Sequence, residues 1–165
     1  MASTTAPTDC LTSAEQQAWR GFLRAYAVLV RELDAELEAG HGLPLTSCEV
    51  LCRLQDAPGQ RMRMCDLADA VLLSRSGLTR LVDRLARDGL LQRRSCSHDA
   101  RGAFAVLTPA GEQALDAARP THLAGVRRRF LERFDADELE RLAEAWERLA
   151  PEGSETRAPD RAMDR

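Results

Sequence analysis

The sequence predicts a mostly helical α+β fold, in which long amphipathic helices flank a small lobe that carries a two-stranded β-hairpin. Apolar side chains recur at three- and four-residue steps over most of the 165 residues, which is the spacing of one helix face. Aromatic residues make up only 4% of the chain, while Ala, Leu and Arg are abundant, as in helices that pack through small side chains. The pattern of residues 91–108 is typical of a hairpin instead, with two short runs of strand-forming residues on either side of a polar turn. We expect one folded domain over 12–150, between disordered segments at 1–11 and 151–165.

The first helix is predicted to begin at a capping box, in which the Thr12 hydroxyl and the Glu15 carboxylate satisfy free backbone N–H groups. An apolar stripe then continues at helical spacing as far as Gly40, through Trp19, Leu23, Tyr26, Val30, Leu33 and Leu37. A helix of this length in a small domain usually packs against something extended, often a second subunit. We therefore predict a dimerisation helix over 12–39.

The next helix is predicted from a second capping box that begins at Thr46, and it ends at the Ala-Pro-Gly breaker of residues 57–59. A short helix follows over 64–71. Ser74 is then a suitable N-cap for another helix, which ends with Gly89 in the C′ position. The inward-facing stripe of that helix consists of Leu78, Leu81, Val82 and Leu85. Two short helices joined by a tight turn, the second amphipathic and rich in Arg, predict a helix-turn-helix.

A β-hairpin is predicted directly after this helix, with strands over 91–96 and 103–108 and a polar turn between them. Such a hairpin is the wing of a winged helix-turn-helix, so residues 45–108 are expected to form one DNA-binding lobe.

Two further helices are predicted over 109–150. Thr108-Pro109 opens the first, since proline suits the first helical position, and Pro120 is expected to kink it. Asp135 caps the second, whose apolar seam consists of Leu139, Leu142, Trp146 and Leu149. We predict that these helices complete the dimer interface, because a monomer would leave their apolar stripes uncovered.

The charge is unevenly distributed along the chain. The net charge is −3, but the segment 61–104 carries nine Arg against five Asp, and the remaining residues carry 14 Arg against 21 acids. A basic middle inside an acidic chain suits a polyanion such as DNA.

The segment from Met62 to Gly111 resembles the MarR family of bacterial transcriptional regulators. MRMCDLADAVLLSRSGLTRLVDRLARDGLLQRR is similar to the recognition segment of that family, and HDARGAFAVLTPAG is similar to its wing. The likeness in order and length of the helices covers roughly residues 12–150. The resemblance implies an obligate homodimer on palindromic operators, which usually represses genes and releases DNA when a small phenolic ligand or an oxidant arrives.

The helix after Ser74 supplies the candidates for double-stranded DNA. Ser76, Thr79 and Arg80 are candidates for base edges, because the Arg fork matches O6 and N7 of guanine. Arg75 and Arg84 are candidates for phosphates, as is the hydroxyl of Ser74 or Ser76 at the helix N-terminus.

In the wing, Arg101 is the candidate for insertion into the minor groove. Arg93 and Arg94 are candidates for the phosphate backbone, and the resemblance implies that Asp99 orients the wing by pairing with an Arg. The alternative function is a winged-helix protein-interaction module without sequence-specific DNA binding. The Arg-rich recognition face favours DNA, since a protein-binding face is more often apolar.

The cysteines are expected to be free thiols in a cytoplasmic protein, because no signal peptide, membrane span or secreted scaffold is evident. Cys48 and Cys52 are spaced to touch one metal ion, but small hydrophobic core residues are the stronger interpretation, and neither a metal nor a cofactor is predicted. Cys96 lies beside Arg93 and Arg94, so it is the candidate for a redox-sensitive thiol.

The family resemblance also implies an effector cleft between the dimerisation helices and the DNA-binding lobe. Trp19, Arg20 and Phe22 are candidates for lining it, with an aromatic effector, although an aromatic stripe at helical spacing is more often core. No nucleotide-binding, hydrolase or metalloprotease motif occurs in the sequence, so an enzyme is not expected.

Overall fold

The computed structural model describes residues 10–71, 73–96 and 99–150, and the side chains of residues 96–102 lie outside its described part. The predicted disordered segments therefore lie almost wholly outside the described residues. Among those residues, no helix combines the length and the apolar character that crossing a bilayer requires.

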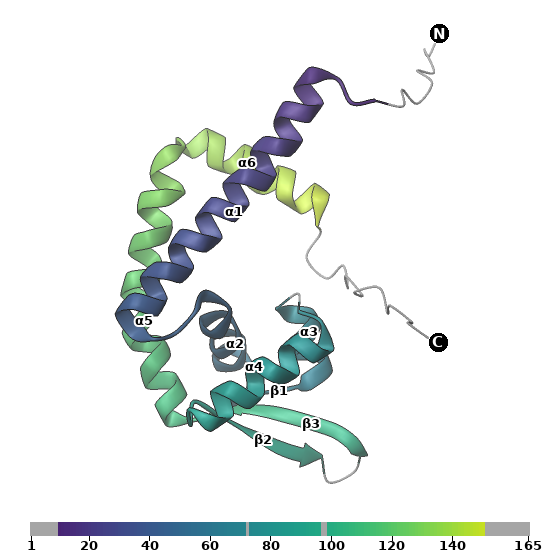
Figure 1. Cartoon of the computed structure of the whole chain (residues 1–165), viewed down its shortest axis with the longest axis vertical. Helices are drawn as coiled ribbons and strands as arrows, with labels where there is room; N and C mark the ends of the chain where they lie inside the picture. Colours follow the sequence, from purple (N-terminus) through teal and green to yellow (C-terminus); the bar gives the residue numbers. More distant parts are fainter. Residues whose placement is uncertain (1–9, 72, 97–98, 151–165) are drawn as a thin grey trace.

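One long helix joins an arm to a lobe (Figure 1). The arm contains α1 (Ser13–His41), α5 (Pro109–Arg129), the short turn η2 (Leu131–Arg133) and α6 (Ala136–Leu149). The lobe contains α2 (Leu45–Asp56), η1 (Pro58–Gln60), β1 (Arg61–Arg63), α3 (Met64–Ala70), α4 (Arg75–Arg87), β2 (Leu91–Cys96) and β3 (Asp99–Leu107). Helix α5 begins at the sheet, packs against both α2 and α1, and ends in the arm. The mostly α winged-helix architecture predicted from the sequence is confirmed.

The sheet has three antiparallel strands in the order β1-β3-β2, whereas the sequence predicted two. The third strand, β1, spans only three residues between a turn and a helix, which is too short to show an alternating pattern. Strand β3 begins at Asp99 rather than at residue 103, so the predicted turn was too long. Both errors concern strand pairing, which depends on partners distant in the sequence.

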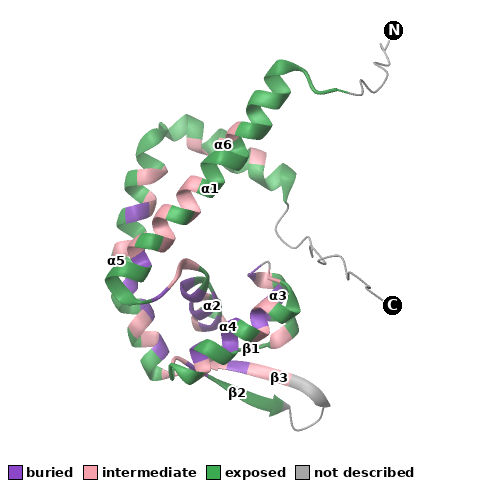
Figure 2. Ribbon diagram, viewed as in Figure 1, coloured by how far each residue is buried: buried purple, intermediate pink, exposed green. Residues whose placement is uncertain are grey.

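The hydrophobic core lies between the lobe helices and the inner face of the sheet, as the purple residues of Figure 2 show. The predicted inward stripe of α4 is buried, and so is the apolar side of α2, at Val50, Leu51 and Leu54. The arm buries much less. Helix α6 is strongly amphipathic in sequence, yet none of its residues is fully buried in the single chain.

Most helix ends follow local capping chemistry. The Thr12 and Asp135 capping boxes are both present, with Glu15 and Glu138 as the reciprocal partners. Helix α1 continues slightly beyond the predicted end, to His41, because Gly42 adopts the left-handed conformation (φ 62°) that closes the helix.

The predicted capping box at Thr46 is wrong. Helix α2 begins at Leu45, with Pro44 in the N-cap position and no side-chain cap of its own. Instead, the Leu45 N–H donates to Oδ1 of Asp34 on α1, at 2.8 Å. A neighbouring helix thus supplies an acceptor for the first free N–H of α2, in place of the local capping box that the sequence pattern predicted.

Close packing and ion pairs hold α1 against α5. A Cβ at Gly125 would lie 2.7 Å from Leu33 Cδ2, so the glycine lets the two helices approach. Arg129 of α5 pairs with both Glu32 and Glu36 of α1. The helix continues through Pro120 without interruption, and Figure 1 shows it bowing gradually rather than breaking.

Candidate nucleic-acid interface

Helix α4 is fixed by its apolar face and presents a polar face to solvent. The Ser74 hydroxyl accepts the Gly77 N–H at 3.1 Å, which confirms the predicted N-cap. A Cβ at position 77 would lie 3.1 Å from that same hydroxyl, so the glycine leaves room for the cap. The exposed positions of α4 include Arg75, Ser76, Arg80, Asp83, Arg84 and Arg87. A short turn joins α3 to α4, so the lobe presents the second helix of a helix-turn-helix.

The hydroxyl candidates on α4 already have partners within the helix. Thr79 donates its hydroxyl proton to the Arg75 carbonyl at 2.9 Å, which leaves its oxygen lone pairs and methyl group for a base. Ser76 Oγ lies 3.3 Å from Ser74 Oγ. Arg80 is exposed and forms no ion pair with a described residue, so its guanidinium is available to a ligand.

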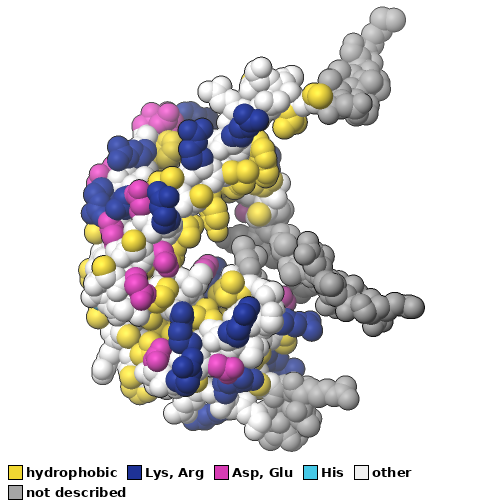
Figure 3. Space-filling model, viewed as in Figure 1, with side chains coloured by type: hydrophobic (Ala, Val, Ile, Leu, Met, Phe, Trp, Pro, Cys, Tyr) yellow, Lys and Arg dark blue, Asp and Glu magenta, His cyan; other side chains and the backbone are white. Residues whose placement is uncertain are grey.

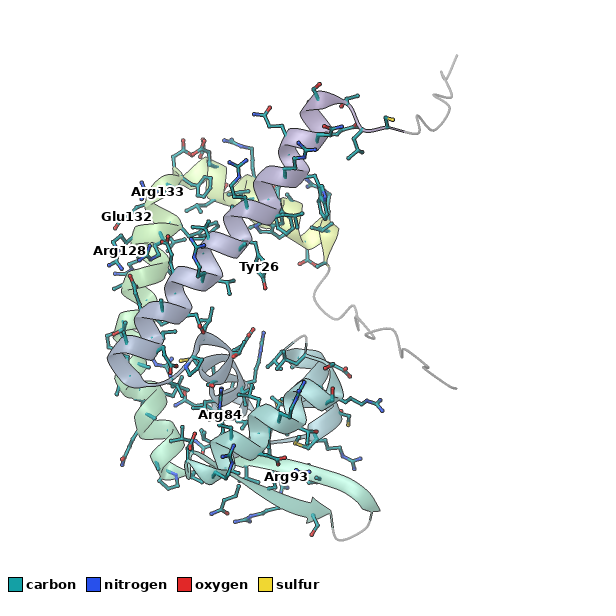
Figure 4. The ribbon with its side chains drawn as sticks, in the orientation of Figure 1. Tyr26, Arg84, Arg93, Arg128, Glu132 and Arg133 are labelled. Carbon is teal, nitrogen blue, oxygen red and sulfur yellow. The ribbon has the colours of Figure 1, made fainter. Side chains whose placement is uncertain are left out.

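Arg84 connects α4 to α2 (Figure 4). Its Nη2 donates to Oγ of Ser47 at 3.0 Å, and Ser47 is fully buried at the start of α2. Arg80, Arg84 and Arg87 line one shallow hollow together with Thr46. The side chain predicted to contact phosphate is therefore also a positioning residue for the recognition helix.

The two predicted wing arginines on β2 lie on opposite faces of the sheet. Arg93 faces α4 and pairs with Asp83 at 2.7 Å, which ties the hairpin to the recognition helix. Arg94 lies opposite Phe104 on the outer face. The side chains of Asp99, Arg101 and Cys96 lie outside the described residues, so their predicted roles stay predictions.

Sequence reasoning missed two arginines, Arg61 and Arg63. They stand on β1, and the guanidinium carbon of each lies 5.7 Å from the centroid of the Phe104 ring. No strand was predicted here, so nothing in the sequence pattern placed them beside the hairpin.

A junction of backbone and hydroxyl groups connects the lobe to α5. Thr108 donates its hydroxyl to the Gly89 carbonyl at 2.7 Å, and the same oxygen accepts the Gly111 N–H at 3.1 Å. The Thr108 N–H donates to the Leu90 carbonyl at 3.2 Å. Because Gly111 has no side chain, α5 begins in direct contact with the loop that ends α4. The orientation of α5 is thereby fixed relative to the recognition helix.

The arm exposes a surface of large apolar side chains, which we call the arm surface. It is formed on α1 and α6 by Trp19, Phe22, Leu23, Tyr26, Trp146 and Leu149. Phe22 lies between the two tryptophans, with ring centroids 6.1 Å from Trp19 and 5.4 Å from Trp146. Figure 3 shows yellow side chains gathered along the inner side of the arm.

A cavity of about 470 Å³ lies among α1, α2 and α5. Its walls are mainly apolar, with a few polar side chains, and include Tyr26, Val30, Cys48, Cys52, Arg119 and His122. The predicted effector residues Trp19, Arg20 and Phe22 are not among the described residues that line it. Figure 4 shows Tyr26 instead, directed from α1 into the concave side of the molecule.

The cavity cysteines differ in environment. Cys48 is buried and donates to the Leu43 carbonyl, and burial raises the pKa of its thiol to about 11. Cys52 is partly exposed and donates to the Asp56 carboxylate at 3.9 Å. The described residues contain no cluster of three His, Cys, Asp or Glu side chains suited to a metal ion.

Comparisons with known proteins agree with this geometry. Residues 41–102 match a family model described as the MarR family. The repressor YetL of Bacillus subtilis (strain 168), described as an HTH-type transcriptional repressor, is 30% identical over 116 residues, which cover 68% of this chain and 69% of YetL. The structure of Sco3205, a MarR family regulator of Streptomyces coelicolor in complex with DNA, superposes with a TM-score of 0.82 at 34% identity, covering 87% of this chain and 93% of Sco3205.

A second regulator of Streptomyces coelicolor, AbsC, superposes with a TM-score of 0.81 at 36% identity over 88% of this chain and 97% of its own. These likenesses span the arm as well as the lobe, and they favour DNA binding over the protein-interaction alternative. With an exposed, arginine-rich α4 capped by Ser74 and tied to the wing by Asp83 and Arg93, the chain belongs to the MarR family of DNA-binding transcriptional regulators.

Proposed function

We propose that this regulator is a cytoplasmic repressor, which binds a palindromic operator as a homodimer and leaves it when a small molecule or an oxidant arrives. The observation that carries the proposal is the polar face of α4, where Arg75, Arg80, Arg84 and Arg87 stand exposed above a fully buried apolar face. Arginine forks at this spacing suit base edges and phosphates of one major groove. The description of YetL as a repressor supports the same direction of control.

The arm surface supports the homodimer. Trp19 is 54% exposed, Tyr26 62% and Leu149 69%, although all three belong to the apolar stripes of amphipathic helices. A surface of this composition is expected to be covered by another protein surface. A second copy covers it most simply, because two-fold symmetry lets the same patch meet itself. Two recognition helices then face successive turns of a palindromic operator.

The cavity supports release by a small molecule. It lies where the arm meets the lobe, so a ligand there contacts α1, α2 and α5 together. His122 Nδ1 is buried with no hydrogen-bond partner in the described structure, and it suits a hydroxyl or carboxyl group on an aromatic ligand. Oxidative release through Cys96 remains a proposal. Cys48 is poorly suited to that role, because its raised pKa keeps the thiol protonated.

Fluorescence anisotropy with the DNA upstream of the regulator's own gene tests the proposal. We expect a preference of about 10³ or more over scrambled DNA and a steep loss of affinity with added salt. Arg80→Ala should weaken operator binding by about 1–3 kcal/mol and reduce discrimination at one position of each half-site. Arg133→Ala, an exposed arginine of the arm, is the matched control and should bind as the wild type does. Equal, weak binding of the wild type to both DNAs would overturn the proposed function.

A further inference from the structure

The outer face of the sheet, turned away from α4, carries a cluster of arginines around one aromatic ring. Arg63 of β1 and Arg94 of β2 both lie directly opposite Phe104 of β3, and Arg61 lies opposite the next outward position, Val106. Residues directly opposite each other in neighbouring strands share a face. We call these three arginines with Phe104 the outer patch.

The outer patch holds its charges in place, and no described residue neutralises them. The guanidinium groups of Arg61 and Arg63 both lie within cation–π range of the Phe104 ring, at 5.7 Å. All three arginines are exposed, and none of them forms an ion pair with a described residue. The remaining outward position among the described side chains of β1 and β2 holds Gln92, and neither strand contains an acidic residue. Arg93 contrasts with them, since it points to the inner face and is paired with Asp83.

The position of the patch separates it from the groove that α4 would read. Helix α4 packs on the inner face of the sheet, where Leu91, Ala105 and Leu107 are buried. The outer patch is therefore separated from α4 by the sheet itself and by the inward side chains on which α4 packs. When α4 occupies a major groove, the outer patch therefore lies over a different part of the DNA.

We propose that Arg61, Arg63 and Arg94 form a second phosphate-binding surface, which contacts the DNA backbone flanking the operator half-site. This inference rests on the proposed operator binding through α4. Charge complementarity selects the occupant: three exposed cations around an aromatic ring suit phosphates, which carry no sequence information but add affinity. The patch would extend the bound length of duplex without adding to sequence discrimination.

Two duplexes that share one operator test the inference. The short duplex ends at the edges of the half-sites, and the long duplex adds about ten base pairs, one helical turn, on each side. We expect the wild type to bind the long duplex more tightly. Arg61→Ala/Arg63→Ala should lose about tenfold in affinity for the long duplex and less than about twofold for the short one. For the long duplex, the slope of the logarithm of the binding constant against the logarithm of the salt concentration should become less steep by about one for each phosphate that the variant no longer neutralises.

The controls separate this idea from a folding defect and from the proposed function. Arg127→Ala/Arg133→Ala removes the same charge from the arm and should bind both duplexes like the wild type. Arg94→Ala leaves both cation–π pairs of the ring intact, so it should show the same length-dependent loss, although smaller, with no change in thermal unfolding. If the outer-patch variants bind both duplexes normally, or weaken both equally, the inference is wrong. Normal binding of both duplexes would leave an acidic protein surface as the ligand of the outer patch. If the wild type itself does not prefer its operator, the proposed function fails instead.

Discussion

Replacing Gly111 by alanine tests whether the start of α5 is fixed by direct contact with the loop that ends α4. A Cβ at this position would lie 2.0 Å from the Leu90 carbonyl oxygen and 2.8 Å from Leu107 Cδ1. Ordinary Cβ contacts begin near 3.4 Å, so the loop and the helix must separate by more than an ångström. The nearest atom belongs to the backbone, and no side-chain rotation relieves the clash.

The magnitude follows from three terms. Overpacking of a tight interior site costs about 1–3 kcal/mol, and a backbone clash belongs at the upper end of that range. Separating the segments also weakens the hydrogen bond from the Thr108 N–H to the Leu90 carbonyl, at about 1 kcal/mol. Alanine recovers about 1 kcal/mol through its higher helix propensity. We therefore expect Gly111→Ala to lower the free energy of unfolding by about 3 kcal/mol, which lowers Tm by about 6–12 °C for a chain of this length.

Thermal unfolding followed by circular dichroism at one fixed protein concentration measures the change, since Tm of a dimer depends on concentration. Gly40→Ala is the matched control. Position 40 is also helical, but a Cβ there meets nothing within 4 Å, so the same substitution should raise stability by up to about 1 kcal/mol. A loss of stability at position 111 together with a gain at position 40 would support the reasoning. A Gly111→Ala protein that melts within a degree of the wild type would refute it.

Two further substitutions examine the arm and the cavity. Trp146→Ala removes the ring that packs against Phe22 in the arm surface. We expect the dimer dissociation constant, measured by sedimentation equilibrium, to rise at least about thirtyfold, which corresponds to about 2 kcal/mol. An unchanged dissociation constant would place the dimer interface elsewhere. A protein that keeps Cys48 as its only cysteine should react with a thiol reagent at pH 8 far more slowly than one that keeps only the exposed Cys10. Burial raises the pKa of Cys48 from 9.0 to about 11, so its thiolate is scarce at pH 8. Equal reaction rates for the two proteins would contradict the burial of Cys48. Because the thiol ionises more readily in the unfolded chain, the stability contributed by burying Cys48 is complete below pH 9 and is lost as the pH rises toward 11.

Local patterns in the sequence predicted the helices well because their determinants lie within a few residues. Ser74 acts as the predicted N-cap, and α5 begins at the predicted Thr108-Pro109, where Thr108 is the N-cap, since each hydroxyl needs only the N–H three residues ahead. The buried stripe of α4 follows from helical periodicity alone. The start of α2 was missed because its acceptor, Asp34, lies on another helix.

The candidate site was only partly predictable, because a sequence shows which residues are charged but not which partners they meet. Arg84 and Arg93 lie on the surface of the lobe, but their contacts with Ser47 and Asp83 depend on the packed structure. Arg61 was missed because β1 is too short to be predicted.

The residues that line the cavity were not predicted, for a related reason. The stripe on α1 contains arm-surface residues and cavity residues, and Tyr26 belongs to both. Only packing against α2 and α5 shows that Tyr26 and Val30 line the cavity. Trp19, from the same stripe, packs against Phe22 instead, and Phe22 contacts Trp146 of α6.

The length of α5 determines how far a small rotation is amplified. Its 21 residues span about 31 Å, with Gly111 against the lobe at one end and Gly125 against α1 near the other. A tilt of about 5° therefore displaces one end by about 3 Å relative to the other. That distance is close to the rise of one base pair, about 3.4 Å, so a tilt of this size would shift each recognition helix by about one step along the duplex. Pro120, near the middle of α5, lacks the N–H that would close one turn there, and a bend at that point would act over only about half of this length.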